Sequence, residues 1–141
     1  MEDIELARSL FQREKLNLVV VKEGQVLLSS NEGGLGPFFQ AIVSRSDDLH
    51  GAAIADKIVG SAAAMLCLYA RIASVYADIA STGALTMLRE KGVTITSKNE
   101  VPHIFDYDGT DLCPFEKLAL SASTPSQLFS ALESFFIEGN Q

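Results

Sequence analysis

The sequence predicts an α/β domain, and this prediction rests on the order of its apolar segments. Short runs typical of buried strands at 52–55, 74–79 and 93–96 alternate with helical segments at 60–71 and 82–91. Such a strand–helix–strand order implies parallel strands joined by crossover helices. The length of 141 residues fits one domain with one core, and 48% of the residues are apolar.

The N-terminal part predicts a helix followed by a β-hairpin. Apolar residues recur at helical spacing over residues 2–13. Residues 16–22 are rich in β-branched side chains, and residues 25–29 form the expected second strand after a turn at Glu23 and Gly24.

A glycine-rich stretch comes next. Residues 33–36 are Gly-Gly-Leu-Gly and precede Pro37, which is favoured in the first turn of a helix. We expect this helix to end before residues 44–48, which are polar and predicted to form a loop. The stretch matches neither G-x-G-x-x-G nor a Walker A loop, so a tight turn is expected. Glycine would still let its backbone approach a ligand closely.

The C-terminal part is less regular. Residues 101–105 are expected to form an edge strand, 106–111 a polar turn and 114–120 a short helix. The final helix begins at the capping residue Thr124. Its apolar face consists of Leu128, Phe129, Leu132, Phe135 and Phe136. We therefore predict a single domain over residues 1–141, with 121–141 as a C-terminal helical extension.

Composition and charge exclude several classes of function. The net charge is −7 and the 11 basic residues are scattered, which argues against non-specific nucleic-acid binding. The longest apolar stretch, residues 58–68, is too short to span a bilayer, so no membrane association is expected. Two cysteines and no signal-peptide pattern predict a cytoplasmic protein.

The strongest candidate site is the predicted junction between the strand at 52–55 and the next helix. In open α/β sheets, ligands bind beyond the carboxyl ends of parallel strands. Asp56 and Lys57 would follow the strand, and Gly60 and Ser61 would begin the helix, whose open N–H groups could bind an anion. We expect a small anionic metabolite or a nucleotide as the ligand. The alternative is an ordinary turn with a solvated Asp–Lys pair.

The second candidate is Cys113, which directly precedes a proline at an expected helix N-terminus. That position favours the nucleophilic thiolate, although Asp111 and Glu116 nearby oppose it. The alternative to a binding protein is therefore a metal-independent enzyme, with Cys113 as nucleophile or with Asp56 and Lys57 as an acid–base pair. Cys113 could equally be a small residue that caps a helix.

No metal or other cofactor is expected. The sequence has no C-x-x-C or H-x-E motif, and His50 and His103 stand alone. The acidic residues within 106–111 do not match an EF-hand loop. Cys67 lies inside an apolar helical segment and is expected in the core.

A third hypothesis is a structural or regulatory interaction module. In that case Phe129, Phe135 and Phe136 of the terminal helix would dock on their own domain or on a second subunit, and the second arrangement would give a homo-oligomer.

Two motifs carry a family resemblance. The stretch Ala-Asp-Lys-Ile-Val-Gly-Ser-Ala-Ala-Ala at 55–64, with Cys-Pro-Phe-Glu-Lys at 113–117, resembles a prokaryotic family of small proteins of unknown function. The resemblance extends from about residue 5 to residue 120. It implies a cytidine-deaminase-like fold, which is a three-layer α/β sandwich with a mixed sheet and helices on both faces.

The same resemblance does not imply deaminase activity. Zinc deaminases hold their metal with H-x-E and P-C-x-x-C motifs. The corresponding places here are Gly-Pro-Phe-Phe at 36–39 and Asp-Lys-Ile-Val-Gly at 56–60, which offer no such ligands. The sequence therefore argues against zinc-dependent deamination, while the pocket at Asp56 and Lys57 would remain available for another ligand.

Overall fold

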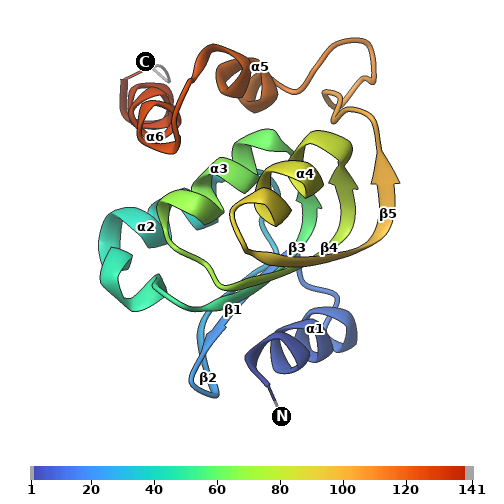
Figure 1. The fold of residues 1–141 in the computed structure, drawn as a ribbon, viewed down its shortest axis with the longest axis vertical. Helices are drawn as coiled ribbons and strands as arrows, with labels where there is room; N and C mark the ends of the chain where they lie inside the picture. Colours follow the sequence, from blue (N-terminus) through green and yellow to red (C-terminus); the bar gives the residue numbers. More distant parts are fainter. Residues whose placement is uncertain (1, 139–141) are drawn as a thin grey trace.

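A computed structural model describes residues 2–138 and contains one five-stranded sheet (Figure 1). The strand order is β2-β1-β3-β4-β5. The strands are β1 (Leu18–Lys22), β2 (Gln25–Ser30), β3 (Ala53–Val59), β4 (Ser74–Ser81) and β5 (Thr94–Val101). β1 is antiparallel to both β2 and β3, whereas β3, β4 and β5 are parallel. The predicted α/β fold with a mixed sheet is therefore confirmed.

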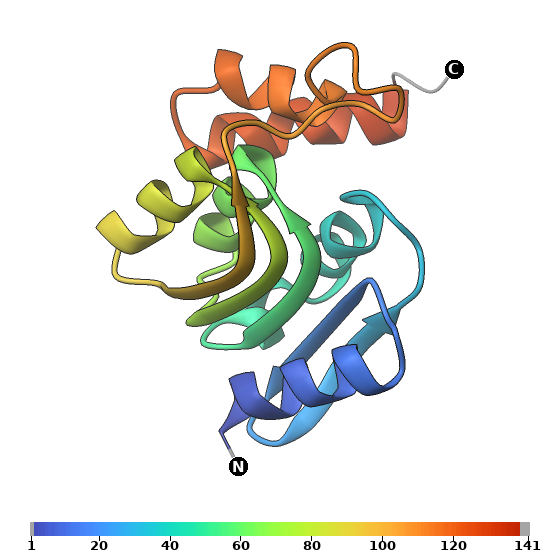
Figure 2. The ribbon, with the colours of Figure 1, turned by 90° about the vertical axis from the view of Figure 1, so that its right-hand side faces the viewer.

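Helices cover both faces of this sheet. α1 (Asp3–Arg13) packs on one face, and α2 (Gly36–Leu49), α3 (Ser61–Tyr69) and α4 (Thr82–Glu90) lie on the other. α5 (Pro114–Ser121), α6 (Pro125–Glu133) and a π-helical turn (Ser134–Glu138) follow. Figure 2 shows α5 and α6 crossing one end of the domain, opposite α1. Within residues 2–138, no helix is both long and apolar enough to cross a membrane.

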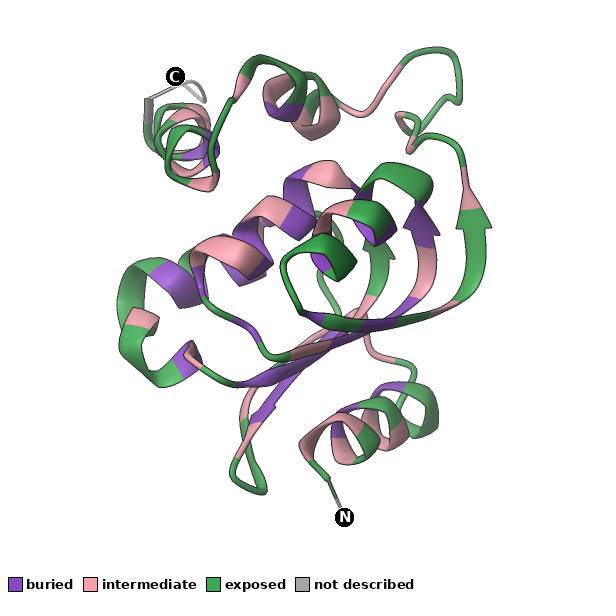
Figure 3. Ribbon diagram, viewed as in Figure 1, coloured by how far each residue is buried: buried purple, intermediate pink, exposed green. Residues whose placement is uncertain are grey.

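The alternation of side chains along β1 explains the two faces. Val19 and Val21 pack with Phe11 of α1, whereas Leu18 and Val20 face the larger core under α2 and α3. Successive strand residues point to opposite sides, so a strand covered on both faces is apolar throughout. Figure 3 shows this burial along β1 and α3. Cys67 of α3 is buried there, as expected.

Aromatic side chains pack the C-terminal helices against the rest of the domain. Tyr69 of α3 stacks on Phe129 with ring centroids 4.4 Å apart, and Phe136 stacks on Phe39 at 5.0 Å. Phe135 contacts Phe115 of α5 edge to face at 5.1 Å. The terminal helix thus docks on its own domain, and homo-oligomerisation stays a prediction.

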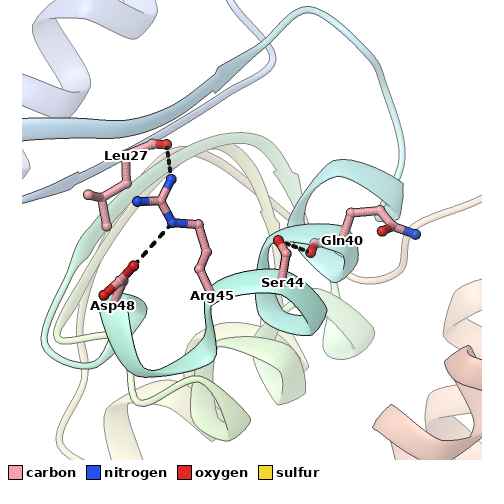
Figure 4. A network of polar contacts seen from close by, with 5 residues as sticks. All are labelled: Leu27, Gln40, Ser44, Arg45 and Asp48. Atoms are coloured by element: carbon pink, nitrogen blue, oxygen red, sulfur yellow. Dashed lines mark hydrogen bonds and ion pairs between the residues drawn. The ribbon is translucent and has the colours of Figure 1, made fainter.

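The predicted loop at residues 44–48 is wrong. This segment belongs to α2, which bends at Arg45 with φ −153° and ψ 46°. Figure 4 shows how polar contacts hold the bend: Arg45 donates to the Leu27 carbonyl at 3.0 Å and pairs with Asp48 at 3.4 Å. Ser44 donates to the Gln40 carbonyl at 2.8 Å. Polar residues here form the solvent-facing side of a helix, which a polar run by itself cannot distinguish from a loop.

Two strands, β3 and β5, run several residues past their predicted ends. β3 continues to Val59, so Asp56 and Lys57 lie inside the strand rather than after it. β5 continues to Val101, and the expected edge strand at 101–105 is wrong beyond that residue. Polar residues interrupt the apolar run at Asp56 and Lys57 in β3 and fill most of the missed part of β5. The criterion of an apolar run therefore ends a strand too early wherever backbone pairing continues through polar residues.

Candidate functional site

A cavity of about 210 Å³ opens at the carboxyl end of β3, between β3, α3 and the start of α5. Four of the predicted site residues line it: Asp56, Lys57, Gly60 and Cys113. The glycine-rich stretch also contributes to its wall. Ser61, the fifth predicted residue, lines a neighbouring cavity instead. Segments far apart in the sequence therefore meet at one place, the end of a parallel strand where ligands commonly bind in α/β sheets.

Asp56 is the unusual titratable group of this cavity. Its side chain is partly buried, and burial raises the pKa of its carboxyl group from 3.8 to about 7, against the opposing effect of the backbone amides of Lys57 and Ile58. Near neutral pH the group therefore exists in both protonation states. As a neutral acid it can donate one hydrogen bond and accept others.

The charge of Asp56 also reaches Cys67. Burial in the core, and to a lesser degree the charge of Asp56, raise the pKa of the Cys67 thiol far above its ordinary value. A buried thiol that keeps its proton is neither a nucleophile nor a metal ligand. Cys67 is therefore a packing residue.

Lys57 lies at the rim of the cavity and is exposed. Its backbone N–H donates to the Asn17 carbonyl at 3.1 Å, which ties the end of β3 to the residue before β1. Among the ion pairs found in residues 2–138, none involves its ammonium group. Lys57 can thus offer a single solvated positive charge to a ligand at the cavity mouth.

Sequence reasoning missed the structural role of Glu116 in α5. Its two carboxylate oxygens accept hydrogen bonds from the N–H groups of Ser61 at 2.8 Å and Ala62 at 2.9 Å. These N–H groups begin α3 and were expected to be open to an anion. That expectation is wrong, because the protein's own carboxylate already occupies the position. The sequence carries no local signal for this contact, since Glu116 lies 55 residues after Ser61.

Gly60 makes the approach of Glu116 feasible. A Cβ atom at this position would lie 2.4 Å from one carboxylate oxygen and 2.7 Å from the other. Those distances are too short for non-bonded atoms, so a larger residue would push the carboxylate away. Gly60 has φ −97°, a value open to other residues, and its role is therefore spatial.

Cys113 is the N-cap residue of α5, directly before Pro114. Its side chain is partly buried, and its N–H donates to the Ile104 carbonyl at 3.1 Å. The structure places Cys113 and Asp56 on the walls of the same cavity. Within residues 2–138, no group of three or more His, Cys, Asp or Glu side chains is arranged so that it could hold a metal ion.

These features define an α/β domain with a mixed sheet and a cavity at the carboxyl end of its central strand. The chain belongs to the DUF1893 family, a domain of unknown function (TM1506), whose model matches residues 6–136. The predicted family resemblance is therefore confirmed.

Two solved structures show where the likeness lies. The chain is similar to the DUF1893 family protein TM1506 from Thermotoga maritima, with 30% identity and a TM-score of 0.82, covering 94% of this chain and 88% of that one. A dCMP deaminase from the cyanophage S-TIM5, in apo form, matches with 17% identity and a TM-score of 0.46, covering 70% of this chain and 94% of that one. No curated protein matches the chain.

The contact between Gly60 and Glu116 can be tested by a double-mutant cycle. Gly60→Ala should lower the free energy of unfolding by about 1–3 kcal/mol, because the new methyl group displaces a carboxylate from two N–H groups. In the Glu116→Ala background the same change should cost much less. Urea denaturation of the four proteins measures both effects. Gly33→Ala is the matched control, since its Cβ would meet nothing within 4 Å. Strictly additive losses would contradict the contact.

Asp56 should make stability depend on pH. Its folded-state pKa of about 7 lies above the ordinary 3.8, so the folded protein retains a proton that the unfolded chain releases between these values. The free energy of unfolding should therefore fall as the pH rises from about 4 to about 7. Asp56→Asn should stabilise the protein above that range, by about 4 kcal/mol at most.

Urea denaturation at about pH 5 and about pH 8 measures this difference. Asp108→Asn, on an exposed loop, is the control for the loss of one carboxylate. If the advantage of Asp56→Asn over wild type were equal at both pH values, burial of a titrating Asp56 would be ruled out.

Proposed function

We propose that the protein binds a small organic molecule in the cavity at β3, with Asp56 as its main polar contact. The observation that supports this proposal is a partly buried carboxyl group of raised pKa on a wall shared with Ile58, Ile104 and Phe115. Pockets for small molecules combine mostly apolar walls with a few polar groups that fix orientation. Perturbed titratable groups also concentrate at such places.

The chemistry of the wall favours a ligand whose buried part is uncharged. Glu116 already occupies the N–H groups at the start of α3, and Glu32 adds a second acidic side chain. A neutral Asp56 carboxyl group pairs one donor and one acceptor with an amide, or with a heterocycle that has an N–H beside a carbonyl or ring nitrogen. Such a planar polar group is the ligand class that we assign to the cavity.

An anionic metabolite or a nucleotide fits this proposal in one orientation. Its uncharged ring would enter the cavity, and its phosphate would stay at the rim beside the exposed Lys57. A phosphate placed at the start of α3 would have to displace Glu116 from two charge-assisted hydrogen bonds. Lys57 is therefore the group expected to distinguish phosphorylated ligands from their uncharged counterparts.

A thermal-shift screen with nucleobases, nucleosides and nucleoside monophosphates tests the proposal. A compound that binds the neutral form of Asp56 should bind about tenfold more weakly at about pH 8 than at about pH 6, because the binding-competent fraction falls with the pKa of about 7. Asp56→Asn should remove this pH dependence. Lys57→Ala should weaken the binding of nucleoside monophosphates and leave the binding of nucleosides unchanged. If no compound stabilises the wild type, or if the binding that is found does not change between about pH 6 and about pH 8, the proposal fails.

A metal-independent enzyme with Cys113 as nucleophile is the second candidate. The observation in its favour is that Cys113 and Asp56 line one cavity, although 57 positions separate them in the sequence. In such an enzyme the Cys113 thiolate would add to a carbonyl carbon of the bound molecule, the π electron pair of the carbonyl group would move to its oxygen, and the protonated Asp56 would donate its proton to that oxygen. Lys57, exposed at the rim, would serve to hold the substrate.

Modification by iodoacetamide separates the binding protein from the thiol enzyme. A nucleophilic Cys113 should react faster than free glutathione near neutral pH, and buried Cys67 should remain unmodified in the folded protein. Mass spectrometry locates the adduct, and Cys113→Ser is the control that should abolish it. Labelling of Cys113 more slowly than glutathione would argue against the enzyme and leave the binding proposal intact.

A further inference from the structure

We propose that the cavity at β3 and a second cavity beside it form one elongated site for a two-part ligand. The polar head of this ligand would lie by Asp56, and an apolar group would fill the second cavity between α3, α4 and α5. This inference rests on the proposed function, because the head is the planar polar group assigned there.

The two cavities share a wall. The second cavity has a volume of about 520 Å³ and lies where the starts of α3 and α4 meet α5 and the residues after β5. Ile104 and Glu116 line both cavities. Ligand sites usually span roughly 300–1,000 Å³, so the first cavity at about 210 Å³ is small for a complete metabolite. The adjoining space supplies the missing volume.

The lining of the second cavity favours an apolar group. Met65, Met87 and Leu120 contribute to its wall, and Leu120 is 76% exposed. Methionine side chains adapt their shape to varied ligands, and covering an exposed leucine removes apolar surface from water.

Two of the hydroxyl groups at this wall, those of Ser81 and Thr82, already have partners within the protein. Ser81 accepts from the Ala84 N–H at 3.2 Å, which caps α4. Thr82 donates to the Glu100 carboxylate at 2.9 Å. These groups therefore do not require polar partners from a ligand, and the cavity can take an apolar group without leaving them unsatisfied.

Glu116 sets the chemistry at the boundary between the cavities, because it lines both of them. Each of its oxygens accepts one backbone N–H, and a carboxylate oxygen can accept a further hydrogen bond. The section of the ligand that lies beside Glu116 should therefore be neutral or a hydrogen-bond donor rather than an anion. Ile104 provides an apolar contact on the same wall.

Two matched probes test this inference: benzamide, which carries the planar amide head, and 4-butylbenzamide, which adds an apolar chain. Isothermal titration calorimetry should give a 4-butylbenzamide affinity at least tenfold above that of benzamide, because the chain is buried in the second cavity. In protein with isotope-labelled methionine methyl groups, the Met65 and Met87 signals should shift with 4-butylbenzamide and not with benzamide.

Two variants test whether the higher affinity of 4-butylbenzamide arises in the second cavity. Leu120→Lys should remove the difference between the probes, because it puts a charge into the wall of the second cavity. Val43→Lys is the matched control, since Val43 is 53% exposed on α2 and lines neither cavity; it should preserve the difference. Equal affinities for the two probes would overturn this inference. Binding of benzamide in that case would still support the proposed function. If neither probe bound, both proposals would fall.

Discussion

The carboxylate of Glu116 at the start of α3 is the contact on which the arrangement of both cavities depends. It satisfies the N–H groups of Ser61 and Ala62, which α3 itself cannot pair, and its charge complements the positive end of the helix. The same residue belongs to α5, so the contact fixes α5 across the carboxyl end of the sheet. Gly60 allows the approach because it has no side chain. Without this carboxylate, the N–H groups of Ser61 and Ala62 would lose their partner, and α5 would lose a contact that holds it beside both cavities.

The mixed direction of the strands explains why the first cavity has walls from so many segments. β3 is parallel to β4 but antiparallel to β1, so the start of β1 lies beside the end of β3. The register pairs Leu18 with Asp56, which brings Asn17 next to Lys57. The chain that leaves β2 then reaches the same edge through Gly33 and Gly34. A purely parallel sheet would place that N-terminal segment at the opposite end.

Local patterns were enough to predict most elements and several residues of the site. Asp56, Lys57, Gly60 and Cys113 were found from strand-end position and helix-start signals, and all four line one cavity. What failed were inferences that need information from distant parts of the chain. The strand through Asp56 is extended by pairing with β1 and β4, and the start of α3 is filled from α5. Neither contact can be predicted from the neighbouring sequence, because both depend on which segments meet after folding.

The position of Glu116 also changes how the site can recognise a ligand. A helix start that binds phosphate selects for charge, whereas this one is neutralised by the protein before any ligand arrives. Asp56, another acidic group of this cavity, is itself held between its charged and neutral forms near neutral pH. An anion entering beside these two carboxylates would meet like charges in a partly buried place, where screening is weak. If the cavity binds a ligand as we propose, its selection would therefore depend on the pattern of donors and acceptors and on apolar shape, and net charge would act at the rim, through Lys57.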